Sequence, residues 1–205
     1  MKVGIIGSGE VGRRLADGFI ELGHQVKIGS RDPNQSKITE WINKHDKEHA
    51  SSGTFADTAT FGELVVLATL WEGTADAIQL ANSKNLAKKI VIDVTNPLDF
   101  SKGMPPTLAL GHTDSAGETV QRMLHDSKVV KAFNIVGNPH MIHPDFPDGK
   151  PTMFICGNDD GAKKFVTEDI LSKFGWETID IGGIEGSRLL EPIALLWILH
   201  YFRTG

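Results

Sequence analysis

Three glycines near the start of the chain have the spacing of a phosphate-binding turn. A short apolar run ends at Gly7, then Gly9 and Gly12 follow at G-x-G-x-x-G spacing, and a helix-like segment comes next. In such a strand–turn–helix the first glycine permits a tight turn, the second lets the backbone approach a pyrophosphate, and the third lets the helix pack against its strand. The helix N-terminus adds free N–H groups and the positive end of its dipole. The motif predicts a dinucleotide-binding site.

The residues after the second predicted strand, 25–28, indicate which dinucleotide binds. Asp32 lies twenty residues after Gly12, where NAD-binding proteins place a carboxylate against the ribose 2′-hydroxyl. Strand alternation instead puts Ser30 at the ribose-facing position, with Arg31 beside it. A serine hydroxyl and a guanidinium can both donate hydrogen bonds to a 2′-phosphate. We therefore expect NADP, with NAD held through Asp32 as the alternative.

The carboxyl ends of the central strands predict the rest of the site, because ligands of doubly wound sheets bind there. Ala68 and Thr69 are expected to flank the nicotinamide ribose. Asn96 can hydrogen-bond a ribose hydroxyl or a carboxamide, and Pro97 fixes the path of the chain as it leaves its strand. Ala132 leaves room for a flat ring beside the nicotinamide. Together these residues would form one wall of a cofactor site.

The sequence offers no arrangement for acid–base or nucleophilic catalysis, so we predict neither a catalytic side chain nor a metal site. Lys131 could donate a proton, but we interpret it as a strand lysine at a sheet edge whose long side chain reaches solvent. His45 and His49 have helical i, i+4 spacing and could bind a metal. They lie in a charged segment, however, that we expect to face solvent.

The segments that must position these residues alternate between apolar strands and helices. Strands are predicted before residue 7 and at 25–28, 53–55, 64–70, 89–94, 128–134, 152–156 and 177–181. Helices are predicted at 13–22, 33–48, 74–81, 116–125, 161–174 and 187–202, and loops at 99–112 and 137–150. This rhythm predicts an α/β protein with a doubly wound, mostly parallel Rossmann sheet. We expect one NADP-binding domain over residues 1–205, with a small C-terminal subdomain at about 151–205 that ends in an apolar helix.

The composition of the chain indicates in which compartment the protein works and which classes of partner it binds. The net charge of −5 comes without a basic block, so we expect no nucleic-acid partner. The single cysteine excludes an intramolecular disulfide, and neither a signal peptide nor a membrane span is visible, so we expect a cytoplasmic protein without a membrane partner. The terminal helix is apolar on nearly every side. It is therefore either buried against the sheet or the interface of the homodimer that we expect in solution.

Five motifs occur in an order that identifies a family. They are Gly29–Arg31, Val91–Leu98, Ser115–Glu118, Val130–Asn134 and Ser187–Glu191. With these motifs the chain resembles the NADPH-dependent reductases of the 8-hydroxy-5-deazaflavin coenzyme F420, and more broadly the NADP oxidoreductase family named after that coenzyme. It is also similar to the cytosolic reductase domain of membrane-bound metalloreductases, which pass electrons from NADPH to a flavin.

The resemblance implies an NADP-dependent oxidoreductase that moves the pro-S hydride of NADPH directly to C5 of a deazaflavin stacked on the nicotinamide. The acceptor that we expect is accordingly an 8-hydroxy-5-deazaflavin or a flavin. Such a transfer depends on positioning more than on acid–base groups. The cofactor residues carried over are Ser8, Gly9, Glu10 and Val11 for the pyrophosphate, Ser30 and Arg31 for the 2′-phosphate, and Thr69, Asn96 and Ala132 for the nicotinamide end. The acceptor pocket would lie near Asn96, Pro97, Leu98, Phe133, Asn134 and Arg188.

Two other functions remain as alternatives. One is a non-catalytic NADP-binding module that acts as a redox sensor or as the docking partner of another chain. The other is an enzyme related to the β-hydroxyacid dehydrogenases and imine reductases. Those enzymes carry a large helical C-terminal domain, whereas only about seventy residues follow Asn134 here.

Overall fold

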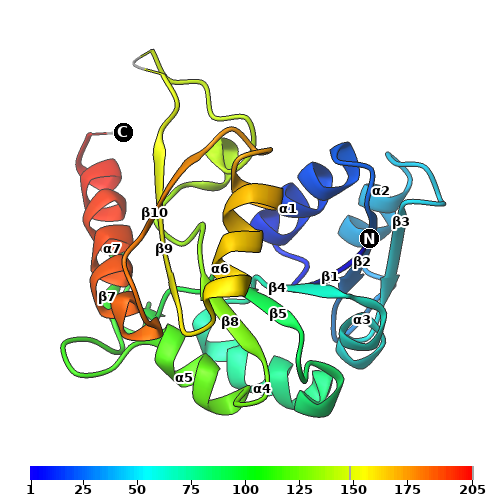
Figure 1. Ribbon diagram of the computed structural model, residues 1–205, viewed down its shortest axis with the longest axis horizontal. Coiled ribbons are helices and arrows are strands. Elements are labelled where there is room, and N and C mark those ends of the chain that lie inside the picture. The colour runs from blue at the N-terminus through cyan, green and yellow to red at the C-terminus, as the bar shows by residue number, and fades with distance from the viewer. Residues whose placement is uncertain (148, 205) are drawn as a thin grey trace.

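The computed structural model describes residues 1–147 and 149–204, and within them eight strands form one sheet in the order β10-β9-β8-β5-β4-β1-β2-β3 (Figure 1). Asp148, in the predicted loop 137–150, and Gly205 lie outside the described residues. All neighbouring strands are parallel except β8 and β9, which confirms the mostly parallel, doubly wound α/β sheet. The strands are β1 (Lys2–Ile6), β2 (Gln25–Gly29), β3 (Ala50–Gly53), β4 (Leu64–Leu67), β5 (Ile90–Asp93), β8 (Lys128–Lys131), β9 (Thr152–Gly157) and β10 (Glu177–Asp180).

Helices cover both faces of the sheet and create two apolar cores. The α-helices are α1 (Glu10–Glu21), α2 (Ser36–Ile42), α3 (Phe55–Phe61), α4 (Trp71–Ala81), α5 (Ala116–Met123), α6 (Asp160–Phe165) and α7 (Ser187–Thr204). The other helical segments are η1 (Ser83–Asn85), η2 (Asn138–His140), the π-helical turn η3 (Val166–Leu171) and η4 (Ile184–Gly186). One core joins α1, α2, α6 and η3, and the other joins α3, α4, α5 and α7.

Strand β4 shows how the sequence fills both cores. Its four residues form a continuous apolar run, as a strand covered on both faces requires. Leu64 and Val66 point into the first core, whereas Val65 and Leu67 point into the second. Burial of each such side chain stabilises the fold by about 1.5–3 kcal/mol. The strands that carry the predicted site are thus held rigidly from both sides.

Three predicted segments differ from the structure. The strand predicted at 53–55 lies earlier, at 50–53, because Thr54 and Asp57 make a capping box that begins α3 at residue 55. The predicted helix 33–48 is much shorter and is reduced to α2. The predicted loop 99–112 contains part of an antiparallel hairpin, formed by β6 (Leu98–Asp99) and β7 (Thr107–Leu108).

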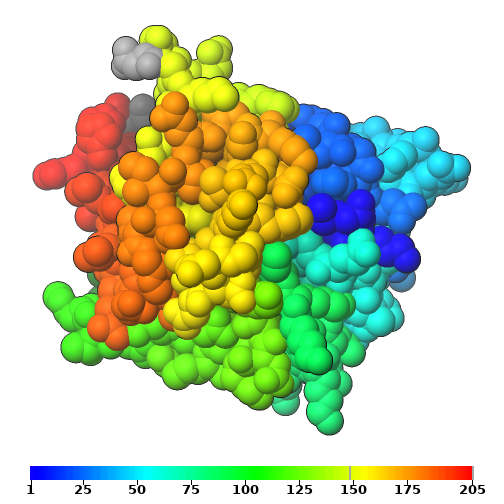
Figure 2. Space-filling view, in the orientation of Figure 1, coloured from blue at the N-terminus to red at the C-terminus, as the bar shows by residue number. Residues whose placement is uncertain are grey.

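Helix α7 lies along one side of the molecule, opposite the end formed by α2 and β3 (Figure 2). Four of its residues are buried, namely Ser187, Leu190, Glu191 and Ala194. Leu189 and Leu196 are 67% and 69% exposed, so the interpretation of a helix buried on every side is wrong. In the described part of the chain, none of the helices has the length and apolar character needed to cross a membrane.

Candidate functional site

The strand register brings the predicted site residues to one edge of the sheet. Ile6, the last residue of β1, pairs with Gly29 of β2 and with Leu67 of β4. Leu67 pairs in turn with Asp93 of β5, which pairs with Lys131 of β8. The segments that leave these strands therefore begin side by side. They carry the glycine turn and the predicted residues at 30–31, 68–69, 96–98 and 132–134.

The glycine turn has the geometry that its spacing predicts. Gly7 has a φ of 124°, and an added Cβ would lie 2.3 Å from the carbonyl oxygen of Ala68. A Cβ on Gly12 would lie 2.2 Å from the carbonyl oxygen of Gly7, so only glycine lets α1 approach β1 this closely. A Cβ on Gly9, in contrast, would have no protein atom within 4 Å.

The N-terminus of α1 is open for an anion. Its N-cap is Gly9, which has no side chain to accept the first N–H groups of the helix. Arg13 folds back over the turn and donates from Nη1 to the carbonyl oxygen of Ser8 at 2.6 Å. The open space at Gly9, the uncapped helix end and a cation close to the turn fit the pyrophosphate of a dinucleotide. Ser8, Glu10 and Val11 belong to the same turn and the first turn of α1.

Ser30 and Arg31 follow β2 directly and lie next to this turn. The N–H of Gly7 donates to the carbonyl oxygen of Gly29 at 3.2 Å, which joins the two segments. The Ser30 hydroxyl oxygen accepts hydrogen bonds from Gln35 Nε2 (2.9 Å) and Asp32 N (3.3 Å), so its position is fixed. Arg31 is exposed and makes no hydrogen bond or ion pair within the described residues. Its guanidinium is therefore available to a phosphate.

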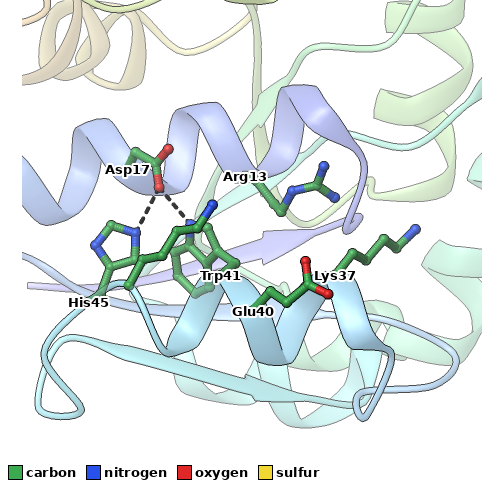
Figure 3. Close-up of a pocket in the computed structure, with 7 residues that line it drawn as sticks. Arg13, Asp17, Lys37, Glu40, Trp41 and His45 are labelled. Carbon is green, nitrogen blue, oxygen red and sulfur yellow. Dashed lines mark hydrogen bonds and ion pairs between the residues drawn. The ribbon is translucent and has the colours of Figure 1, made fainter.

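A cavity of about 290 Å³ lies between α1 and α2 (Figure 3). Asp17, Trp41 and His45 line this cavity. The Asp17 carboxylate accepts hydrogen bonds from Trp41 Nε1 (2.6 Å) and His45 Nε2 (2.9 Å). Arg13 and Lys37 extend at the end of the cavity away from His45. The prediction that His45 faces solvent is wrong, because its side chain is partly buried. It is bonded to Asp17 and packs beside Trp41, with the two ring centroids 4.9 Å apart.

Two asparagines join the segments that follow β5 and β8. Asn96 Nδ2 donates to the backbone oxygen of Asn134 at 2.8 Å, and Asn134 Nδ2 donates to Asn96 Oδ1 at 3.0 Å. The Oδ1 atom of Asn134 is buried and has no hydrogen-bond partner within the described residues. After β4, the Thr69 hydroxyl lies 2.8 Å from the Thr74 hydroxyl at the start of α4. Pro97 O accepts from Ala109 N at 2.7 Å, which ties the strand end to the hairpin.

The residues that follow β8 are less accessible than the sequence suggests. Ala132, Phe133 and Asn134 are all buried, and the Phe133 ring packs against Phe174 in the core, with ring centroids 6.1 Å apart. Phe133 also has a φ of 62°, a conformation that residues with a side chain rarely adopt and that is often found at functional sites. The wall here presents backbone atoms of 132–134, with the partly exposed side chains of Asn96 and Leu98 beside them.

Lys131 corrects another expectation. Its side chain does not reach solvent from a sheet edge, because β8 lies between β5 and β9 and the side chain is completely buried. Nζ lies 3.0 Å from Asp93 Oδ2 and 2.9 Å from Glu191 Oε1. Burial by itself lowers the pKa of Lys131, but the two carboxylates outweigh it and hold the pKa above the usual lysine value. Lys131 is thus a buried cation and not a proton donor to solvent.

Arg188, predicted near the acceptor, lies in the first turn of α7 and pairs with Glu118 of α5. Its Nε donates to Glu118 Oε2 at 2.8 Å, and its Nη2 donates to Glu118 Oε1 at 2.5 Å. The hydrogen bonds from Arg188, followed by one from Ser115, lower the pKa of the Glu118 carboxyl, although desolvation opposes them. Ser115 is the N-cap of α5, and its hydroxyl oxygen accepts from Glu118 N at 3.2 Å. The Ser115 N–H donates to Asp114 Oδ1 at 2.9 Å and not to Glu118, so the reciprocal bond of a capping box is missing.

Sequence reasoning missed two contacts at the site. Asn138 Nδ2 donates to Glu10 Oε2 at 3.2 Å, so the loop after β8 touches the glycine turn. Gln35 fixes Ser30 from five residues further on. No local pattern signals the first contact, because it joins residues 128 positions apart. The second could have been anticipated from the turn-forming residues that follow Arg31.

The doubly wound sheet, the uncapped glycine turn and the adjacent Ser30–Arg31 pair define a dinucleotide-binding α/β protein. The family model described as "NADP oxidoreductase coenzyme F420-dependent" matches residues 2–97. The F420-dependent NADP reductase of Methanocaldococcus jannaschii is 33% identical over 97% of this chain and 91% of the relative. The chain belongs to the family of F420-dependent NADP oxidoreductases.

Two further similarities extend the comparison. A crystal structure assigned as an F420-dependent NADP reductase from Arthrobacter sp. FB24 is 39% identical, with a TM-score of 0.92 over 99% of this chain and 94% of that one. Metalloreductase STEAP3 of Rattus norvegicus is 30% identical over 95% of this chain. The chain spans only 36% of the length of that metalloreductase.

Proposed function

We propose that this protein transfers hydride between NADPH and an 8-hydroxy-5-deazaflavin or flavin acceptor. The observation that carries the proposal is that the open glycine turn and the Ser30–Arg31 segment lie side by side, connected by the hydrogen bond between Gly7 and Gly29. This arrangement supports simultaneous binding of a pyrophosphate and a ribose 2′-phosphate. The kinship with F420-dependent NADP reductases supports the class of acceptor.

The cofactor contacts follow from the order of the segments along the sheet edge. We assign the pyrophosphate to Gly7, Ser8, Gly9, Glu10, Val11 and Gly12, and the 2′-phosphate to Ser30 and Arg31. We assign the nicotinamide end to Ala68, Thr69, Asn96, Pro97 and Ala132. NADPH, when bound, supplies the hydride, and the acceptor takes up the two electrons with that hydride and one proton from solvent. The protein's part is to hold the two rings in contact and to exclude water.

Apolar side chains beside the nicotinamide end support a flat aromatic acceptor. Leu70 is exposed, and Trp71, which begins α4, is partly exposed. Helix α4 contacts strand β6, which begins at Leu98. The hairpin that follows exposes Phe100 and Met104. We assign Leu98 and the backbone of Phe133 and Asn134 to the acceptor, with Arg188 at its margin.

The proposal is tested by following NADPH oxidation with coenzyme F420, FMN and FAD, and by repeating the measurement with NADH. We expect turnover with NADPH, and we expect Arg31→Ala to raise the KM for NADPH without changing the KM for NADH. Lys164→Ala is the matched control, because it removes an exposed cation on α6 whose ion-pair partner is Glu168, at 4.0 Å. Equal use of NADPH and NADH, with Arg31→Ala changing neither, would contradict the 2′-phosphate assignment. NADPH binding without turnover on any acceptor would favour the non-catalytic module.

A flavin acceptor is the second candidate, and the similarity to a metalloreductase favours it. The acceptor series distinguishes the two, because a deazaflavin enzyme should prefer F420 over FMN and FAD. The dehydrogenase and imine reductase alternative is less well supported. The residues after Asn134 complete the sheet with β9 and β10 and add α6, η3 and α7, which leaves no separate helical substrate domain within the described residues.

We also propose that residues 1–205 act as one NADP-binding unit and form a homodimer in the cytoplasm. The sheet runs without interruption through β8, β9 and β10, so the 151–205 segment shares the core of the N-terminal half. The exposed apolar side chains of α7 support a dimer. They include Leu189, Leu196, Tyr201 and Phe202, and apolar area of this kind is typical of obligate interfaces.

A further inference from the structure

Three buried charged side chains meet behind the nicotinamide end of the site. They come from the end of β5 (Asp93), the end of β8 (Lys131) and the second turn of α7 (Glu191), and their side chains are 0%, 0% and 2% exposed. Removing such a cluster from water is costly, and apolar residues of similar volume are often at least as stable in its place. Stability alone therefore does not explain why charged residues occupy these positions.

The cluster holds every polar atom of Thr95. Asp93 Oδ1 accepts hydrogen bonds from Thr95 N (2.9 Å) and Thr95 Oγ1 (2.8 Å). Lys131 Nζ donates to Thr95 O at 2.5 Å. The next residue is Asn96, whose amide is paired with Asn134. The position of the Asn96–Asn134 pair is thus set by charged groups that themselves lie out of reach of any ligand.

Glu191 links this arrangement to two helices. While Oε1 contacts Lys131, the same carboxylate accepts hydrogen bonds from the N–H groups of Ala116 and Gly117 at 3.0 Å each. These N–H groups begin α5, and their partial positive charge compensates the second carboxylate of the cluster. A Cβ on Gly117 would lie 2.1 Å from Ser187 Oγ, so α5 and α7 are in close contact at this point.

We propose that Glu191 is a positioning residue for hydride transfer: through Lys131 and Thr95 it fixes the Asn96–Asn134 pair against the nicotinamide. The proposal rests on the proposed function. The Glu191 side chain is 2% exposed and out of reach of a bound cofactor or acceptor, so its effect passes through Lys131 and Thr95. The same contacts link α7 indirectly to the end of the site at which the two rings must meet.

Glu191→Gln tests the proposal, because it keeps the volume and removes the charge. We expect the Kd for NADPH to change by no more than about twofold, since the assigned phosphate contacts lie in the segments that follow β1 and β2. We expect kcat to fall roughly 10- to 100-fold, the effect of misplacing reacting groups by up to about 1 Å. The fluorescence anisotropy of bound NADPH should fall as well, because the nicotinamide is held less firmly.

Lys163→Met is the matched control. Lys163 is another buried lysine with two carboxylate partners, Asp160 at 3.1 Å and Asp180 at 2.8 Å, but it belongs to α6 and its side chain reaches Asp180 of β10. We expect it to lower Tm as Glu191→Gln does and to leave kcat and anisotropy unchanged. If Glu191→Gln also lowers only Tm, the cluster is merely structural and the proposal is wrong.

Thr95→Val keeps the test decisive if Glu191→Gln does not fold. It removes the hydroxyl bound to Asp93 and keeps the side-chain shape, so it should reproduce the loss of kcat and anisotropy; no change in either would overturn the proposal. The anisotropy also separates this inference from the proposed function. A wild-type protein that binds NADPH but reduces no acceptor would refute the proposed function, and the variants would still show whether Glu191 orders the nicotinamide.

Discussion

Replacing Gly9 by alanine should weaken NADPH binding without weakening the fold. The backbone at Gly9 has a φ of −69°, which alanine adopts readily, and the added Cβ would meet no protein atom within 4 Å. The unfolded chain loses some freedom with alanine, so the free energy of unfolding should rise by up to about 1 kcal/mol. The methyl group would nevertheless occupy the space that we assign to the pyrophosphate.

The size of the binding loss follows from contact distances. A phosphate oxygen bound to an N–H group lies about 2.9 Å from the nitrogen, and it must move outward by roughly 0.5–1 Å to accommodate a methyl group. Loss of one hydrogen bond to a charged group, which contributes about 1.5–3 kcal/mol, together with weakening of a second by about 0.5–1 kcal/mol, corresponds to a total of about 2–4 kcal/mol. The Kd for NADPH should therefore rise roughly 30- to 1,000-fold.

Gly12→Ala should have the opposite effect on the fold, because here the added methyl group lowers stability. Its Cβ would lie 2.2 Å from the Gly7 carbonyl oxygen, so α1 must shift by about 1 Å to restore an ordinary contact. The strain should lower the free energy of unfolding by about 1–3 kcal/mol. Gly111→Ala is the control, because its Cβ meets nothing within 4 Å and it lies outside the turn.

The assay combines a fluorescence titration with NADPH and urea unfolding of each variant. Of the three variants, only Gly9→Ala should bind NADPH more weakly while keeping at least the wild-type free energy of unfolding. Only Gly12→Ala should have a lower free energy of unfolding. A Kd of Gly9→Ala for NADPH within about threefold of the wild-type value would refute the reasoning, because the added methyl group would clash with a pyrophosphate bound at this turn.

Four further outcomes are expected. Arg31→Ala should raise the Kd for NADPH about tenfold or more in an isothermal titration and leave the Kd for NADH unchanged, because we assign the guanidinium to the 2′-phosphate alone. Leu196→Asp should lower the molar mass measured by light scattering from that of a dimer to that of a monomer. A wild-type protein that is monomeric at micromolar concentration would refute the dimer. Arg188 hydrogen bonds lower the pKa of Glu118, so this pair stabilises the fold above the usual carboxyl pKa and its contribution is lost as pH falls through the lowered value. Glu118→Gln should therefore flatten the decline in unfolding free energy between about pH 6 and about pH 3. Burial raises the pKa of Cys156 to about 11, so a thiol reagent at neutral pH should label it only after unfolding, and rapid labelling of the folded protein would contradict this.

The fold and the strand-end residues could be predicted because their signals are local. The spacing of Gly7 and Gly12 reflects a backbone turn within one strand–turn–helix, and strand periodicity located the edge on which the site lies. The missed helix α3 also had a local signal, because Thr54 and Asp57 have the spacing of a capping box. Its short apolar face was outweighed by the strand-like residues before it.

The burial of side chains could not be predicted, because it depends on elements far apart in sequence. Lys131 has the sequence context of a strand lysine, and only the arrival of Glu191 from α7 makes full burial possible. The side chain of Phe133 is directed into the core by a left-handed backbone, which no periodicity indicates. Arg188 is held by Glu118, a partner seventy residues away.

The packing of α1 limits how far the cofactor half could be separated from the remainder of the protein. The Phe19 ring lies 5.3 Å from that of Phe174, and a Cβ on Gly18 would meet Ile142 at 2.2 Å. Both partners lie beyond residue 97, where the match to the family model stops. An excised fragment 1–97 would contain the glycine turn and the Ser30–Arg31 segment yet leave one side of α1 bare, with a tendency to self-associate. Fragment complementation with residues 98–205 would restore the missing cover, so residues 1–97 carry the assigned phosphate contacts but depend on the rest of the chain to fold.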